Sequence, residues 1–213
     1  MLPFYAKSFN TVEINNTFYH VPIENTVKKW LSNLPVGFVF SIKGNRNITH
    51  FKRLTDVSDL VKQFYKSLSP LGEHLAVVLW QLPPSLKKDM NVLKSFLDVL
   101  DHEPKGKAIE FRHQSWVDPE VMDVLKVHNV SFVVSHGDNY PLVINETTAN
   151  FVYVRLHGYP LLYRSGYSQE QLIWWREYIQ GWLRQGKDVF VYFNNDAEGY
   201  AVENALLLKQ ICA

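Results

Sequence analysis

Charged and titratable side chains interrupt an apolar segment near the middle of the chain. The segment AIEFRHQSW, residues 108–116, begins like a β-strand and then brings Glu110, Arg112, His113 and Trp116 close together. Carboxylate, guanidinium and imidazole groups bind anions and transfer protons. A strand normally buries hydrocarbon, so this pattern indicates a site where the strand ends.

Other short apolar segments carry polar groups at corresponding points. Side chains alternate across a strand, so residues two apart share one face. The residues selected by this parity are Glu13 and Asn15, Ser41 and Lys43, Glu110 and Arg112, Tyr153, Arg155 and His157, and Tyr192, Asn194 and Asp196. If the strands are parallel, we expect these groups to meet at one edge.

This reasoning gives two sets of candidate residues. The candidate catalytic residues or metal ligands are Glu13, Glu110, His113, His157 and Asp196. The candidate ligand-binding residues are Asn15, Lys43, Arg46, His50, Arg112, Trp116, Arg155, Tyr163, Asn194 and Asn195. Acids and histidines at several strand ends could also ligate a hard divalent metal, although no recognised metal-binding spacing is present.

The inward-facing charges also fit a structural role. Three acids, Glu13, Glu110 and Asp196, balance three bases, Lys43, Arg112 and Arg155. Such a set could fill the interior as compensated ion pairs and do nothing else. Well-packed hydrocarbon usually stabilises a core as well or better, which favours a ligand site as the reason for the charges.

Two further segments have alternative interpretations. The basic segment 43–54, KGNRNITHFKRL, could hold phosphate oxygens or simply face solvent. The tyrosines of 157–167 could form a lid that stacks on a base or sugar ring, or could pack on helices. Trp174, Trp175 and Trp182 lie in a helical pattern, and we expect them in the core.

The chain alternates between predicted strands and helices. Seven strands are predicted, at 11–15, 38–43, 75–80, 108–113, 131–136, 151–158 and 188–196. Helical spacing begins at Leu86, and N-cap patterns at Asp118 and Ser168 begin two more helices. Further helices are expected near 24–33, 56–69 and 200–211, and a loop over 137–150. The alternation indicates an α/β fold with parallel strands, and polar strand faces favour a TIM-barrel-like (β/α) barrel over a doubly wound sheet.

Composition limits the possible classes of protein. The 213 residues carry a net charge of +1, which does not favour binding to nucleic acid or to a membrane surface. A single cysteine suits a reducing compartment, and no segment reads as a signal peptide or membrane span. We therefore expect one soluble, cytoplasmic domain spanning 1–213, whose oligomeric state the sequence does not predict.

Several motifs, in their order, resemble the YecE-like family, domain of unknown function 72. They are FNTVEINNTFYHVP, IKGNRNITHFKRL, LWQLPPS, IEFRHQSW, FVYVRLHG and VYFNNDAEGYAVENA. The resemblance implies a TIM-barrel-like fold. Members of the family typically begin with a further strand of the type GTSGWSY, which is missing here, so we expect a barrel with seven recognisable strands. Either the start of the sequence is misplaced or cut, or the protein tolerates an open seam between the first and last strands.

Three functions are consistent with these residues. The first is a hydrolase that acts on a phosphate-bearing substrate, conceivably nucleic acid, with or without a divalent metal. The second is a binding module for a small anionic or sugar-like ligand, without catalysis. The third is a structural protein whose charged interior is inert.

Overall fold

The computed structural model describes residues 2–137 and 139–213, and these divide into two compact units, Met1–Ile109 and Glu110–Ala213. Both units combine parallel strands with helices, so the α/β class is confirmed. No strand pairing among the described residues closes a sheet into a ring. The expected barrel therefore stays a prediction.

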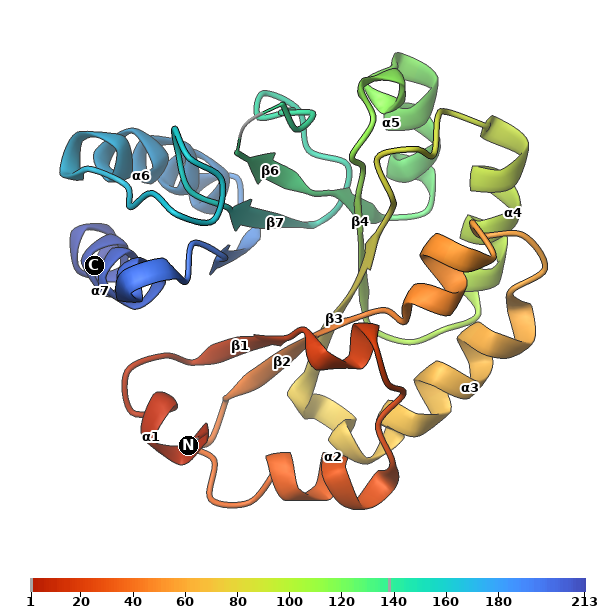
Figure 1. The fold of residues 1–213 in the computed structure, drawn as a ribbon, viewed down its shortest axis with the longest axis horizontal. Helices are drawn as coiled ribbons and strands as arrows, with labels where there is room; N and C mark the ends of the chain where they lie inside the picture. Colours follow the sequence, from red (N-terminus) through yellow and green to blue (C-terminus); the bar gives the residue numbers. More distant parts are fainter. Residues whose placement is uncertain (1, 138) are drawn as a thin grey trace. The chain divides into compact units, whose positions relative to one another are not determined.

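The first unit contains the strands β1 (Thr11–Ile14), β2 (Val39–Lys43), β3 (Leu75–Gln81) and β4 (Gly106–Glu110), except that Glu110, the last residue of β4, belongs to the second unit. These strands are neighbours in that order (Figure 1). Its helices are α1 (Leu2–Tyr5), α2 (Glu24–Trp30), α3 (Ser58–Leu68) and α4 (Met90–Asp101). Short helical turns are η1 (Asn16–Phe18), η2 (Asn47–Phe51) and η3 (Ser69–His74).

The second unit begins where β4 ends. Its strands are β5 (Val130–Phe132), β6 (Val134–His136), β7 (Phe151–Leu156) and β8 (Asp188–Phe193). The last three form a parallel sheet in the order β6-β7-β8. Its helices are α5 (Pro119–Val127), α6 (Gln169–Arg184) and α7 (Tyr200–Cys212), with the turns η4 (Gln114–Trp116) and η5 (Ala197–Gly199).

Local signals in the sequence fixed several helix ends. Asp118 accepts a hydrogen bond from the backbone N–H of Glu120 at 2.9 Å, and proline occupies the first position of α5. Ser168 and Gln171 form the predicted capping box of α6. The helix expected from Leu86 instead begins at Met90, because the Asp89 carboxylate caps it.

Two predicted strands differ from the structure. The segment 131–136 is split into β5 and β6 at Val133, so the described residues form eight strands where seven were predicted. The segment 108–113 stops being a strand after Glu110, which leaves Arg112 and His113 in the connection beyond β4. Polar residues at these positions already mark the change from buried strand to loop.

The core of the first unit is built around Trp80 of β3. Its ring is fully buried and packs against Phe64 of α3 and Phe96 of α4, at centroid distances of 5.7 and 5.5 Å. Gly44, directly after β2, lies so close that an added Cβ would fall 2.3 Å from the Trp80 ring. Glycine is therefore required at position 44, because the backbone there lies too close to the Trp80 indole for any side chain.

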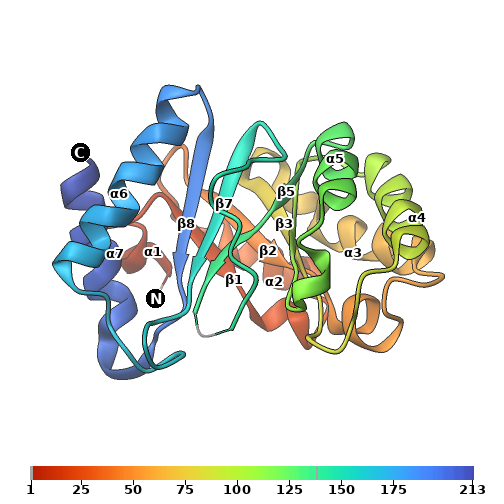
Figure 2. The same ribbon diagram turned by 90° about the horizontal axis from the view of Figure 1, so that it is seen from above.

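The core of the second unit lies between its sheet and the helices α6 and α7, which cover the same face (Figure 2). Alternate residues of β7, Val152, Val154 and Leu156, point toward these helices. Trp175 and Trp182 of α6 are buried there, as expected. Trp174 is 44% exposed, so its predicted place in the core was wrong: neighbouring residues on a helix point about 100° apart. In the described chain, no helix combines the length and apolar character needed to cross a membrane.

Two glycine substitutions test this packing. We expect Gly44→Ala to lower the free energy of unfolding by about 1–3 kcal/mol or more, because the new methyl group overlaps the rigid Trp80 ring. Gly181→Ala, inside α6, should instead raise it by up to about 1 kcal/mol, because the new Cβ would meet only the end of the Arg184 side chain, at 4.0 Å. Urea unfolding of both variants measures the difference, and equal effects would contradict the packing of Gly44.

Candidate functional site

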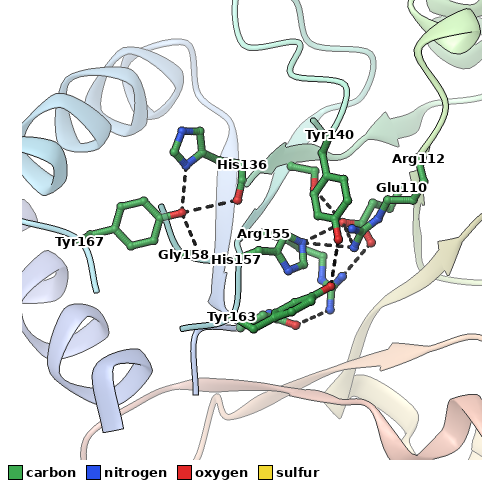
Figure 3. A network of polar contacts seen from close by, with 11 residues as sticks. Glu110, Arg112, His136, Tyr140, Arg155, His157, Gly158, Tyr163 and Tyr167 are labelled. Atoms are coloured by element: carbon green, nitrogen blue, oxygen red, sulfur yellow. Dashed lines mark hydrogen bonds and ion pairs between the residues drawn. The ribbon is translucent and has the colours of Figure 1, made fainter. Parts of the chain in front are cut away.

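The polar side chains of the second unit gather around Glu110, the last residue of β4. Its carboxylate is fully buried and has four partners (Figure 3). Oε2 pairs with Arg155 Nη1 at 2.7 Å, and Oε1 pairs with Arg112 Nη2 at 2.8 Å. Oε1 also lies 3.0 Å from His157 Nε2 and accepts a hydrogen bond from the Ser135 hydroxyl at 2.8 Å. These five residues are called the Glu110 network below.

Strand alternation explains how the Glu110 network assembles. Ser135 of β6 and Arg155 of β7 are paired in the parallel register, so both side chains project from the same face of the sheet. His157 follows β7 with the same parity. The opposite face of the same strands carries the apolar core. The periodicity of the sequence therefore placed Arg155 and His157 beside one another.

The electrostatics of the network keep Glu110 ionised. Burial alone would raise the pKa of the Glu110 carboxyl, but the guanidinium groups of Arg155 and Arg112 outweigh it and hold the pKa well below its usual range. A carboxyl group in this state cannot donate a proton at neutral pH. Both of its oxygens are engaged by cations, so Glu110 does not fit the role of a metal ligand either.

His157 is buried and neutral. Burial lowers the pKa of His157 to about 4, although the hydrogen bond to Glu110 acts in the opposite direction. Nε2 cannot both donate to Glu110 and accept from Arg112 Nη2, which lies 3.3 Å away. With either tautomer, Nδ1 has no hydrogen-bond partner among the described residues. If Nε2 carries the proton, Nδ1 is a free buried acceptor.

Arg112 is held between a carboxylate and an aromatic ring. Its side chain is 4% exposed, and its Cζ lies 3.6 Å from the centroid of the Tyr140 ring. Within the described chain, its Nε has no hydrogen-bond acceptor. Unsatisfied buried donors are rare and carry a substantial free-energy cost.

Two tyrosines from different loops cover the network. The hydroxyl groups of Tyr140 and Tyr163 are 3.0 Å apart, and both rings meet the His157 ring edge to face (Figure 3). Burial, with the bond to Tyr163, raises the pKa of Tyr140 to about 12, so the phenol stays protonated at neutral pH. Tyr163 is 44% exposed, which puts this pair between the network and solvent.

The remaining candidates of the second unit have other surroundings. Asn194 accepts a hydrogen bond from Arg155 Nη2 at 2.6 Å, which joins it to the network. Asn195 is fully buried and donates to Ser165 O and Asn204 Oδ1, which connects β8 to α7. Asp196 is exposed at the start of η5.

His113 and Trp116 lie in the connection after β4. His113 Nδ1 accepts a hydrogen bond from the backbone N–H of Ser115 and so caps η4. Trp116 is fully buried and packs on Phe111, with the ring centroids 4.8 Å apart. Neither residue contacts Glu110 through a described hydrogen bond.

The first unit holds the other candidates. Glu13 faces the same side of the sheet as its register partner Ser41, and Asn15 follows β1. Lys43 Nζ lies 4.5 Å from the Phe18 ring centroid, and Arg46 lies over Tyr19 and Phe51. His50 in η2 bonds to Thr49 at 2.9 Å and contacts Phe18 edge-on. These basic residues form a cation–aromatic cluster within their own unit.

Two residues of the site were not among the sequence candidates. Ser135 shares the parity of the polar face in SFVVSH and could have been found by the same alternation rule. Tyr140 lies in the predicted loop 137–150, where no periodicity indicates which side chain turns inward. Only the folded chain places its ring on Arg112.

The state of His157 predicts a pH dependence of stability. Its pKa is lower in the folded protein than in the unfolded chain, so the unfolded chain binds more protons between about pH 4 and 6.5, and stability falls as the pH drops through this range. The loss approaches roughly 3 kcal/mol. In urea unfolding, the stability advantage of the wild type over His157→Gln should shrink from pH 7 to 4. Substitution of the exposed His20 by Gln serves as the control. If the stability difference between wild type and His157→Gln stays constant with pH, the pKa of His157 is the same in the folded and unfolded chains, and the prediction is wrong.

Known structures share this fold. The crystal structure of a DUF72 family protein from Thermotoga maritima MSB8 superimposes with a TM-score of 0.83 and 30% identity, over 95% of this chain and 84% of that one. A DUF72 family protein from Enterococcus faecalis V583 gives a TM-score of 0.88 at 22% identity, covering 100% of this chain and 88% of the other. At that identity the second likeness concerns the fold alone.

Similar sequences belong to the same group. The chain is 29% identical to UPF0759 protein YunF of Bacillus subtilis (strain 168), over 97% of this chain and 84% of YunF. UPF0759 protein YecE of Escherichia coli (strain K12) is 34% identical over 110 residues, which are 51% of this chain and 40% of YecE. The model of the family described as "Protein of unknown function DUF72" matches residues 1–213. The chain therefore belongs to the DUF72 family, the YecE-like proteins.

Proposed function

We propose that the second unit binds a small, oxygen-rich anion, such as a phosphate-bearing molecule, through Arg112 and His157. The observation that carries this proposal is the buried Arg112 guanidinium, whose Nε has no acceptor among the described residues. An oxygen atom of an anionic ligand would satisfy this donor. Guanidinium groups suit this role because their N–H groups match carboxylate and phosphate geometry.

The charge around Arg112 supports an anionic ligand. Glu110 is shared with Arg155, so its single negative charge neutralises Arg112 only in part. His157 is neutral and does not change this balance. Its unpartnered Nδ1 could donate to a ligand oxygen in the tautomer that leaves Nε2 unprotonated. With a net charge of +1 on the whole chain, a small ligand is favoured over a polyanion such as nucleic acid.

Access to Arg112 requires a movement of its cover. In the described conformation Tyr140 stacks on the guanidinium and bonds to Tyr163. We take this pair as a closed cover that opens for the ligand and then stacks on it. The Tyr140 phenol stays available as a hydrogen-bond donor to an anion at neutral pH, because its pKa is raised.

The expected TIM-barrel-like fold also supports a ligand site at Glu110 and His157. Active sites of such barrels lie at the C-terminal ends of the strands. Glu110 ends β4 and His157 directly follows β7. Lys43 and Arg46 follow the end of β2 in the first unit, and they remain proposed phosphate contacts of that unit.

Inorganic phosphate tests the anion site. We expect phosphate to raise the melting temperature, because a ligand that binds only the folded state stabilises it by about 2.7 kcal/mol at a concentration one hundred times its Kd. Arg112→Gln should abolish this shift. Differential scanning calorimetry across a phosphate series, with chloride at equal ionic strength, provides the measurement.

Two further variants separate binding from folding. Arg112→Lys keeps the positive charge beside Glu110 but lacks the Nε donor, so it should fold and still lose most of the phosphate response. Arg164→Gln removes an exposed arginine of the same unit and should keep the full response. A shift of equal size in wild type and both Arg112 variants would reject the site.

Hydrolysis of a phosphate ester is a second candidate function, and the free Nδ1 of His157 favours it. When Nε2–H donates to Glu110, the carboxylate fixes the tautomer in which Nδ1 can accept a proton. Nδ1 would take a proton from water as the water oxygen bonds to phosphorus. The bond from phosphorus to the ester oxygen breaks, and the leaving oxygen keeps its electron pair. Glu110 would act as a positioning residue in this reaction.

Turnover of para-nitrophenyl phosphate distinguishes the two functions. A general base contributes about 10²–10⁴-fold to the rate, so His157→Gln should lower kcat by that factor. The calorimetric test shows whether a variant still binds phosphate. A variant that has lost phosphate binding is inactive because it lacks the ligand, and not because it lacks a general base. His20→Gln controls for removal of a histidine. Phosphate binding without any turnover would leave the binding module as the function and reject the hydrolase.

A further inference from the structure

A second pocket lies in the same unit, on the helix-covered side of the sheet. It has a volume of about 360 Å³, within the range of small-molecule sites. Four aromatic side chains supply most of its wall: Tyr159, Tyr167, Trp174 and Trp175. Neither Arg112 nor His157 lines it, so it is separate from the proposed anion site.

The aromatic rings enclose the pocket at different angles. Trp174 and Trp175 are nearly perpendicular, at 82° with centroids 5.1 Å apart. His136 lies between Tyr159, Tyr167 and Trp175, at centroid distances of 5.4, 5.6 and 5.4 Å. Several aromatic rings lining one space are a feature of sites that bind quaternary ammonium groups, because such cations are attracted to ring faces.

Charge at the pocket also favours a cation. Glu170 supplies the one carboxylate among the described lining residues, and no lysine or arginine is among them. The Ser168 hydroxyl donates to Glu170 Oε2 at 2.8 Å and lowers the pKa of that carboxyl, which is therefore ionised at neutral pH. Its negative charge lies at the N-terminus of α6 and offsets the positive end of the helix dipole there.

The imidazole in the wall does not oppose a cation. Burial lowers the pKa of His136, so the ring is neutral at pH 7. Its Nδ1 is paired with the Tyr167 hydroxyl at 2.9 Å, which also accepts a hydrogen bond from Gly158 N–H (Figure 3). These bonds fix the inner wall. The outer wall is open to solvent, since Tyr159 and Trp174 are 47% and 44% exposed.

From these observations we propose that the pocket between β6 and the start of α6 binds a small quaternary ammonium cation, held by the faces of Trp174 and Tyr159 and by the carboxylate of Glu170. Nothing in this proposal depends on the anion site, which lies on the other face of β6 and β7.

Titration of the full chain with choline tests the proposal by calorimetry. The control ligand is dimethylbutanol, the uncharged carbon isostere of choline, which has the same shape without the positive charge. We expect choline to bind and dimethylbutanol to bind at least tenfold more weakly. Equal affinities would show an ordinary apolar pocket and overturn the proposal, as would the absence of choline binding or a preference for acetate.

Two variants locate the binding. Trp174→Ala should weaken choline binding roughly tenfold, which is the typical size of one cation–aromatic contact. Glu170→Gln keeps the side-chain volume and should also weaken it, whereas Glu177→Gln, exposed on the same helix outside the pocket, should not. Unchanged affinity in both pocket variants would overturn the assignment. Phosphatidylcholine vesicles distinguish a lipid head group from the free cation, and binding to vesicles alone would reject a small-molecule site.

Discussion

The buried ion pairs of Glu110 are the interaction on which the second unit depends. One carboxylate, fully removed from water, is matched by two guanidinium groups, a hydroxyl and an imidazole. Removing one partner of such a pair typically costs 3–5 kcal/mol, because the remaining charge stays buried. Four segments of chain, the ends of β4, β6 and β7 and the connection after β4, are therefore tied to one point. None of these segments can shift alone without exposing a charged group or leaving it buried without a partner.

The same network is incomplete as a purely structural element. A compensated plug would satisfy each donor, yet Arg112 Nε and His157 Nδ1 lack partners among the described residues. A hydrocarbon core would avoid this cost, as the opposite face of β7 shows with Val152, Val154 and Leu156. The two faces of one strand thus follow different rules. One buries apolar side chains beneath α6 and α7, and the other holds buried polar atoms, two of which lack a partner among the described residues.

Much of the fold could be predicted from local signals. Strand positions, the caps at Asp118 and Ser168, and the polar parity of Arg155 and His157 all depend on neighbouring residues, and local chemistry decides them. The break at Val133 and the late start of α4 could not be predicted, because apolar periodicity continues through both. Among the candidate site residues, the surroundings of Trp116 could not be predicted from its position beside charged groups. The folded chain buries its ring and packs it on Phe111.

The sequence by itself determined which residues carry charge, which face of each strand they occupy and which family the chain resembles. Strand alternation and motif order depend only on residues that are near one another in the sequence. Tertiary structure alone decided that Glu110 is shared by Arg112, Arg155 and His157, and that Tyr140 covers the guanidinium. It also decided that Trp174 is half exposed at the rim of a pocket while Trp175, which lines the same pocket, is buried. The physical reason is distance along the chain: partners separated by tens of residues meet only after the strands pair, and burial then sets their charges.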